Sequence, residues 1–256
     1  MNLDEFVKKP YPGQLVFAKI AGSRCYNLAM PESDEDYFGV YAPPTEQLVG
    51  LHMPPDTLDG HEPDWVVHEV GKFCNLLLKG NPSIVEALWT DRNTYETAAW
   101  RELKKERRRV LSEHTVKQYL GYALGQLQKL AKGSYLHTTG GKPNHKWSCH
   151  LIRLLMDAGQ IATGGEPVIW KEDTERSFLM SIREGQYSVE QVEKMAKEMI
   201  AKIDAIKPWA VPDAGDEAFM NEWLLSVRRG EWGGSKLACD ALTAESQRMG
   251  FYGGNS

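Results

Sequence analysis

The sequence predicts an α+β protein whose strands come first and whose helices follow. Apolar and β-branched runs of strand length occur in the first 70 residues, at 15–20, 37–41 and 64–70. From Gly71 onward, the apolar residues recur mainly at helical spacing. No internal repeat is present, so nothing in the sequence suggests a solenoid.

The composition is that of a globular protein. Of the 256 residues, 42% are hydrophobic and 25% are charged, which is enough for a substantial core in one large domain or two modest ones. The net charge of −5 disfavours a broad nucleic-acid footprint, although local basic patches survive such an average.

We expect a cytoplasmic protein without a membrane partner. No apolar stretch approaches the length of a membrane span, and the acidic N-terminus is unlike a signal peptide. The cysteines lie far apart with no CxxC pair, so they predict reduced thiols and no structural zinc motif. They are Cys25, Cys74, Cys149 and Cys239.

A small-residue turn follows the first predicted strand. The strand at 15–20 runs into Gly22-Ser23-Arg24, and such a turn can offer backbone N–H groups and a hydroxyl to a phosphate. The turn therefore indicates a phosphate site, provided that a metal or other cation lies nearby.

Two aspartates precede the second predicted strand, at 37–41. Asp34 and Asp36 are two residues apart, so on extended backbone their side chains point to the same face. Two carboxylates that close repel each other unless a cation lies between them, which favours a divalent metal. The alternative is an acidic surface turn, because 33–36 also has ordinary loop composition.

A third strand is predicted at 64–70, after a long loop or broken hairpin at 42–63. Alternation places Asp64 on one face of this strand and Glu69 on the other. Either carboxylate could meet the aspartate pair, and the periodicity does not choose between them.

The helices predicted after Gly71 have recognisable ends. The first ends at Lys79-Gly80, and the next begins with Asn81 as its cap and Pro82 at its first position. A basic helix at 98–111 is better explained as a solvated face with glutamate partners than as an RNA-binding patch. Further helices are expected at 114–132, 147–162, 177–183, 188–206 and 219–229.

A possible cationic stripe lies on the helix at 147–162. Lys146, His150 and Arg153 fall at i, i+4 and i+7, so they share a face, and three cations would suit a phosphate chain. A polar stripe exposed to water, with His150 bonded to a backbone carbonyl, explains the same pattern. The glycine-rich segments 133–146 and 230–256 are the least readable, and we expect the second to be weakly ordered or docked late.

Taken together, these blocks resemble the nucleotidyltransferase superfamily that includes DNA polymerase beta. More narrowly, they resemble its RNA-repair-associated, polymerase-beta-like family, which has many bacterial and bacteriophage members of this size. The resemblance extends over roughly residues 15 to 200. It is carried by Gly22-Ser23, Ser33 to Val40, Lys72-Phe73, Lys79 to Glu86 and Lys146 to Arg153.

The resemblance implies a small mixed β-sheet core at 1–95 and a mostly helical domain at 96–256 that closes over a nucleotide. It also implies Mg²⁺- or Mn²⁺-dependent transfer of a nucleoside monophosphate from an NTP such as ATP, with release of pyrophosphate. Two metals would neutralise the entering and leaving oxygens of such a transfer.

The residue roles follow from the same resemblance. Asp34 and Asp36 would bind the metal, with Asp64 as third carboxylate and Glu69 as the alternative. Asn27 stands where many relatives have glycine, which would narrow the conformations of the turn. The nucleotide would be held by Gly22, Ser23, Arg24, Lys79, Asn81, Lys146, His150 and Arg153.

The sequence leaves the acceptor open among an RNA end, a small molecule and a protein hydroxyl. Composition does not favour RNA. A catalytically silent nucleotide-binding protein, or a toxin–antitoxin-type interaction protein on the same fold, is the alternative to an enzyme.

Overall fold

The computed structural model describes residues 1–132 and 145–231 of the chain. The chain divides into two compact units. One consists of Met1–Asn75, Thr90–Arg107 and the chain from Glu217 onward, and the other of Leu76–Trp89 and Arg108–Asp216. We call them the sheet unit and the helical unit. The sequence predicts a single boundary between residues 95 and 96, whereas the chain passes between these units more than once.

The sheet unit contains a five-stranded mixed sheet, in the order β3-β4-β2-β1-β5. β2 and β4 are parallel, and the other neighbours are antiparallel. The α+β class and the mixed sheet are therefore confirmed. The strands are β1 (Gln14–Ile20), β2 (Tyr37–Ala42), β3 (Thr57–Gly60), β4 (Trp65–Glu69) and β5 (Thr94–Glu96).

Three of these strands match the apolar runs in the sequence, and two do not. β1, β2 and β4 agree with the predicted segments to within about a residue at each end. β3 lies inside the stretch 42–63, for which the sequence predicts a long loop or broken hairpin, and it forms a hairpin with β4. β5 has only three residues, too few for a periodic pattern.

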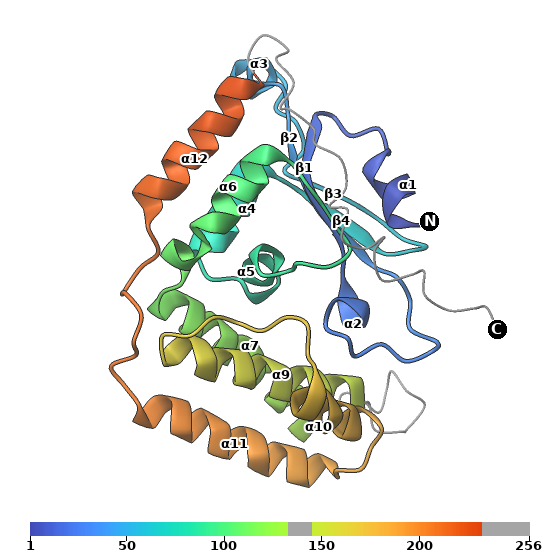
Figure 1. The fold of residues 1–256 in the computed structure, drawn as a ribbon, viewed down its shortest axis with the longest axis vertical. Coiled ribbons are helices and arrows are strands. Elements are labelled where there is room, and N and C mark those ends of the chain that lie inside the picture. The colour runs from blue at the N-terminus through green and yellow to red at the C-terminus, as the bar shows by residue number, and fades with distance from the viewer. Residues whose placement is uncertain (133–144, 232–256) are drawn as a thin grey trace, which may run out of the picture. The chain divides into compact units, whose positions relative to one another are not determined.

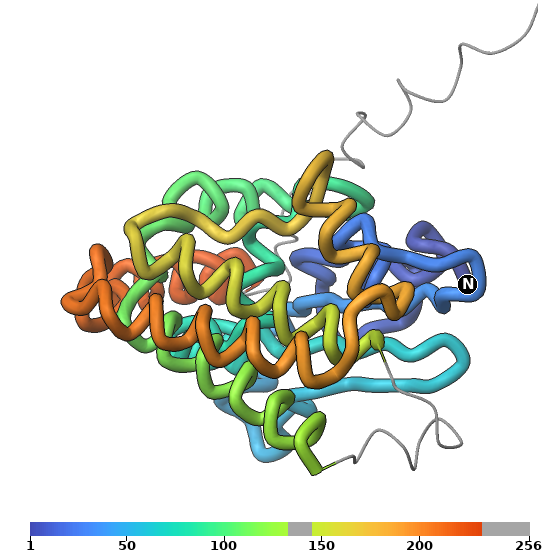
Figure 2. Tube along the Cα trace, turned by 90° about the horizontal axis from the view of Figure 1, so that it is seen from below, coloured from blue at the N-terminus to red at the C-terminus, as the bar shows by residue number. Residues whose placement is uncertain are grey.

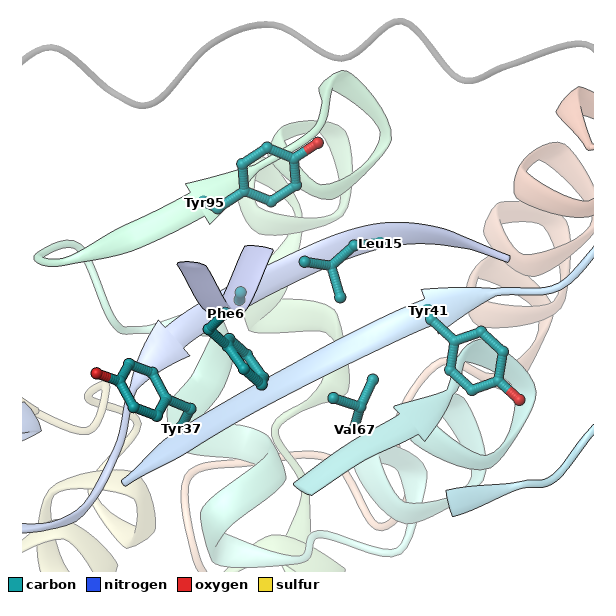
Figure 3. Close-up of a cluster of buried hydrophobic side chains, with 7 residues drawn as sticks. Phe6, Leu15, Tyr37, Tyr41, Val67 and Tyr95 are labelled. Carbon is teal, nitrogen blue, oxygen red and sulfur yellow. The ribbon is translucent and has the colours of Figure 1, made fainter. Parts of the chain in front are cut away.

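One face of the sheet packs against α1 (Leu3–Val7). Phe6 of this helix stacks on Tyr37 with ring centroids 5.0 Å apart. Figure 3 shows Phe6 beside Tyr37, with Val67 and Tyr41 further along the same buried cluster. A capping box between Asn2 and Glu5 begins the helix, which the sequence indicated only as a short lead-in.

The opposite face is covered by aromatic side chains from two other helices. Phe17 of β1 stacks on Trp100 of α6 (Ala98–Lys105), with centroids 3.9 Å apart, and Trp100 also contacts Phe73 of α4 (Val70–Leu78). Burial on both faces fixes the register of the sheet, because a slip of one residue would exchange the two faces.

Short elements and one long helix complete the sheet unit (Figure 1). The short helices are α2 (Gly22–Cys25) and α3 (Thr45–Val49). The 3₁₀ turn η1 (Arg107–Val110) follows α6, so the helix predicted at 98–111 is divided in two. The indole of Trp223 in α12 (Glu217–Gly230) donates to the carbonyl of Ala99 over 2.9 Å.

The helical unit is built around α9. Figures 1 and 2 show α7, α9 and α11 running side by side, and α10 also packs against α9. Its helices are α5 (Pro82–Leu88), α7 (Glu113–Ala131), α9 (His145–Ala162), α10 (Asp173–Arg183) and α11 (Val189–Ala205). Asn81 caps α5 with Pro82 at its first position, as predicted.

Several expectations fall on residues outside the described ranges. These are most of the loop at 133–146, nearly all of 230–256, and Cys239. Within the described residues, none of the helices has both the length and the apolar character that crossing a bilayer requires.

Candidate functional site

The structure brings the Gly-Ser turn into contact with the second aspartate. Gly22 has φ +63°, and a Cβ on it would lie only 2.5 Å from Oδ2 of Asp36. The backbone N–H of Ala21 donates to the carbonyl of Asp36 over 2.7 Å. The absent side chain at position 22 is therefore what lets the Asp36 carboxylate lie against the turn.

Arg24 links the same turn to the acidic loop. Its guanidinium donates to the carbonyl of Ser33 over 2.8 Å and lies 3.8 Å from the carboxylate of Glu35. Asn27, further along, adopts φ +61°, a left-handed conformation that asparagine tolerates better than most residues. Asparagine at this position is thus accommodated by its own backbone preference.

Asp36 and Asp64 precede neighbouring parallel strands. Tyr37 pairs with Trp65, and the N–H of Tyr37 donates to the carbonyl of Asp64 over 3.0 Å. The two aspartates therefore lie at the same end of the β2–β4 pair. Asp34 is exposed on the loop before β2.

The Asp64 carboxylate lies 3.0 Å from Nδ1 of His61, and both side chains are exposed. The neighbouring carboxylate raises the pKa of His61 above its usual value. The Asp64 carboxylate is therefore exposed to solvent, at the end of the β2–β4 pair where Asp36 also lies.

Glu69, the alternative third carboxylate, is used elsewhere. It lies at the far end of β4, and its carboxylate accepts from the N–H groups of Gly71 (2.8 Å) and Lys72 (3.0 Å) at the start of α4. Arg228 of α12 lies 3.4 Å from it. Its pairing with Tyr41 places it on the sheet face opposite Asp36, since side chains alternate along a strand. The geometry favours Asp64 over Glu69.

The carboxylates near the turn offer the oxygen donors that Mg²⁺ prefers. Among the residues that the structure describes, no three His, Cys, Asp or Glu side chains form a group that could hold a metal ion. The carboxylate oxygens of Asp34 and Asp36 are donors that suit such an ion, and Gly22 lets the Asp36 carboxylate lie against the turn.

The three residues of the expected cationic stripe, Lys146, His150 and Arg153, do not form an exposed row of cations in the structure. Arg153 is only 2% exposed and donates to the carboxylates of Glu86 (2.7 Å) and Asp157 (3.2 Å). Lys171, also buried, donates to Asp157 over 2.8 Å. Arg153 is therefore the cation of an internal ion-pair network, and helical spacing alone could not distinguish this from an exposed position.

His150 is not a cation near neutral pH. Burial lowers its pKa to about 4, and the charge of Arg153, whose Nη2 lies 3.2 Å from its Nδ1, acts in the same direction. Lys146 is exposed. Of the three residues on the stripe, Lys146 alone combines exposure with a positive charge.

The family assignment rests on a direct match. The model of the RNA repair pathway DNA polymerase beta family (RlaP) covers residues 1–208. The chain belongs to this family. A search of curated proteins found no match.

In this polymerase-beta family member, Lys79 and Asn81 lie at the junction between α4 and α5. Lys79 is exposed. The side chain of Asn81 accepts from the N–H of Ile84 and donates to the hydroxyl of Tyr122 over 3.0 Å. Asn81 thus has a structural task as helix cap besides the nucleotide contact that the resemblance implies.

Sequence reasoning missed Lys19, a buried lysine in β1 of this family member. It is 4% exposed, and its Nζ donates to the hydroxyl of Thr90 (3.1 Å) and to Sγ of Cys25 (3.6 Å). Pairing with Phe38 puts Lys19 on the sheet face of Asp36. The signal was a single lysine inside an otherwise apolar strand.

The basic residues at 101–109 lie among carboxylates, as the sequence favoured. Lys104 pairs with Asp91 (2.9 Å) and Glu96 (2.6 Å) in the sheet unit. In the helical unit, Arg109 pairs with Asp216 over 2.6 Å. Most of these basic side chains therefore form ion pairs with carboxylates of the same unit.

A pH prediction follows from the buried His150. Its pKa is lower in the folded chain (about 4) than the usual 6.5, so below pH 6.5 the unfolded chain binds a proton that the folded chain does not. The free energy of unfolding that is lost through His150 is therefore close to zero at pH 7 and grows as the pH falls towards 4. Relative to His150→Gln, we expect wild type to lose about 2 kcal/mol between pH 7 and 5, measured by urea unfolding. Parallel stability curves for the two proteins would contradict this.

Proposed function

We propose that this protein is a metal-dependent nucleotidyltransferase, which moves a nucleoside monophosphate from an NTP to an acceptor hydroxyl and releases pyrophosphate. The observation that carries the proposal is the contact between Gly22 and Asp36 in a chain of the polymerase beta family. A silent nucleotide-binding protein would not need both Asp34 and Asp36.

The metal half of the proposal assigns Asp34, Asp36 and Asp64 as ligands of Mg²⁺, or of Mn²⁺. When bound, the metal would supply positive charge and Lewis acidity at the α-phosphate. The chain's own contribution is to hold the ligands. Gly22 leaves room for the Asp36 carboxylate, and Arg24 ties the acidic loop to the turn. The parallel strand pair holds Asp64 at the same end of the sheet.

The nucleotide half assigns the phosphates to the Gly22-Ser23-Arg24 turn, with Lys79, Asn81 and Lys146 as further contacts. Backbone N–H groups of such a turn are suited to phosphate oxygens. His150 contributes without a charge, since its pKa is lowered to about 4. We assign no acceptor, because an RNA end, a small molecule and a protein hydroxyl all offer the same attacking oxygen.

Equilibrium binding and product analysis test the proposal together. The full chain is titrated with each of the four NTPs, with Mg²⁺ and with EDTA, and then incubated with γ-labelled NTP and pools of RNA, small molecules and protein. We expect Mg²⁺-dependent binding and labelled pyrophosphate. Binding without any pyrophosphate would favour the silent alternative, and the absence of binding to every NTP would overturn the proposal.

Replacing Gly22 by alanine tests the contact that carries the proposal. The new Cβ meets Asp36 Oδ2 at 2.5 Å and sits at φ +63°, so the turn or the carboxylate must move. We expect Gly22→Ala to lose about 1 kcal/mol of stability and at least tenfold in affinity for Mg²⁺-NTP, by urea unfolding and calorimetry.

The matched control is Gly121→Ala in α7, where nothing lies within 4 Å of the new Cβ. A helical Gly-to-Ala change stabilises by up to about 1 kcal/mol, and we expect nucleotide affinity to stay unchanged. Equal affinities of Gly22→Ala and wild type would contradict the role of the turn.

A further inference from the structure

A buried lysine, a cysteine and a threonine contact one another in the sheet unit. Nζ of Lys19 lies 3.1 Å from the hydroxyl oxygen of Thr90 and 3.6 Å from Sγ of Cys25. The same hydroxyl lies 3.6 Å from Sγ of Cys25. Lys19, Cys25 and Thr90 are only 4%, 7% and 3% exposed. An amine and a thiol therefore meet away from bulk water, with a hydroxyl in contact with both.

The local fold explains why these three side chains meet. Lys19 is the next-to-last residue of β1, and Cys25 ends the four-residue helix α2 that follows it. Lys19 also pairs with Thr94 of β5, so the chain that carries Thr90 into β5 passes beside it. All three residues belong to the sheet unit, and their contacts depend on that unit alone.

The ammonium group of Lys19 has no carboxylate partner in the part of the chain that the structure describes. Lys104 of the same unit is also largely buried, but it pairs with Asp91 (2.9 Å) and Glu96 (2.6 Å). Burying a cation without a counter-charge is costly. A lysine placed instead against a thiol indicates a chemical role for the pair rather than a stabilising one.

We propose that Lys19 and Cys25 form an oxidative modification site, at which hydrogen peroxide joins Nζ to Sγ as a reversible sulfenamide. The thiolate is the form of cysteine that reacts as a nucleophile, and a cysteine sulfenic acid condenses with a neighbouring nitrogen. The site needs neither a nucleotide nor a metal, so it goes beyond the proposed function.

The reaction balances with one molecule of peroxide. Starting from a thiolate beside the ammonium, Sγ attacks a peroxide oxygen, the O–O bond breaks, and the ammonium gives a proton to the departing hydroxide. The amine then attacks the sulfur of the sulfenic acid, the S–O bond breaks, and the second hydroxide takes a proton from the nitrogen. The products are one N–S bond and two waters, with the sulfur oxidised and the peroxide reduced by two electrons. The hydroxyl of Thr90 contacts both reacting atoms, so it can relay these protons.

Peptide mapping of the folded full chain tests the site. The protein is treated with hydrogen peroxide at neutral pH, unfolded, alkylated with iodoacetamide and digested with trypsin. Trypsin cleaves after Arg24, so it separates Lys19 from Cys25 in the unmodified chain. We expect these two residues in fragments that stay joined, that together lack two hydrogens, and that dithiothreitol separates.

Two controls accompany the experiment. Lys19→Arg keeps a cation, but a guanidinium stays protonated and cannot attack the sulfur, so we expect oxidised Cys25 without a link. Cys74 and Cys149 are internal controls, because burial raises the pKa of their thiols to about 12 and about 11. We expect both to be recovered as alkylated thiols, and circular dichroism checks that Lys19→Arg is folded.

The wild-type result alone can overturn the inference. Cys25 recovered as an alkylated thiol, or oxidised without a link to Lys19, contradicts it. A link from Cys25 to a different lysine, or joined fragments in Lys19→Arg, does the same. The experiment contains no nucleotide, so its outcome is independent of whether the protein transfers a nucleoside monophosphate.

Discussion

Asp36→Asn is expected to abolish nucleotidyl transfer, by at least about a thousandfold, while the protein stays folded. The substitution keeps the size of the side chain and removes the negative charge that a divalent metal needs. Asp36 also lies against Gly22, so the substitution acts at the contact between the turn and the proposed metal ligands. The measurement is pyrophosphate release, with Mg²⁺-NTP affinity and urea unfolding on the same preparation.

The matched control is Glu32→Gln, which makes the same carboxylate-to-amide change at an exposed position on the same loop. We expect its activity and stability to equal those of wild type. Full activity in Asp36→Asn would contradict the assignment of the metal site, and unfolding of Asp36→Asn alone would show that Asp36 is structural.

Arg153→Met is expected to destabilise the protein by about 3–5 kcal/mol. Glu86 and Asp157 are 1% and 0% exposed. Removing Arg153 takes a cation away from both buried carboxylates, while Lys171 stays bonded to Asp157 and lies 3.6 Å from Glu175. Desolvation already raises the pKa of Asp157, so its charge depends on these partners. Denaturant unfolding at pH 7 measures the loss.

Two further variants test whether burial of the ion pairs causes the loss of stability expected for Arg153→Met. Arg109→Met breaks an ion pair between half-exposed side chains and should cost less than about 1 kcal/mol. Adding Glu86→Gln to Arg153→Met replaces a buried carboxylate that has lost Arg153 by a neutral amide, and should recover part of the lost stability. A loss in Arg153→Met no larger than in Arg109→Met would contradict the network.

The parts of the fold that the sequence predicted are those set by local patterns. The apolar runs at 15–20 and 37–41 became β1 and β2, and Asn81 with Pro82 gave the start of α5. The contact between Gly22 and Asp36 joins two motifs that the sequence singled out, because the β1–β2 pairing brings their ends together.

The parts that escaped prediction depend on partners distant in the chain. Arg153 and Glu86 are 67 positions apart, so helical spacing showed a shared face but not that the face was buried. Glu69 lies 3.4 Å from Arg228, which is 159 positions later in the chain, and alternation along β4 could not reveal that partner. β5 pairs with β1, and no local periodicity reveals that pairing.

The central claim is that this chain transfers a nucleoside monophosphate with release of pyrophosphate. The most direct measurement follows α- and γ-labelled NTP in parallel, with the full chain, Mg²⁺ and the mixed acceptor pools. The account predicts that the γ-label leaves as pyrophosphate while an equal amount of α-label becomes attached to an acceptor, and that Asp36→Asn does neither. Release of the γ-label as inorganic phosphate, with no α-label transferred, would contradict it.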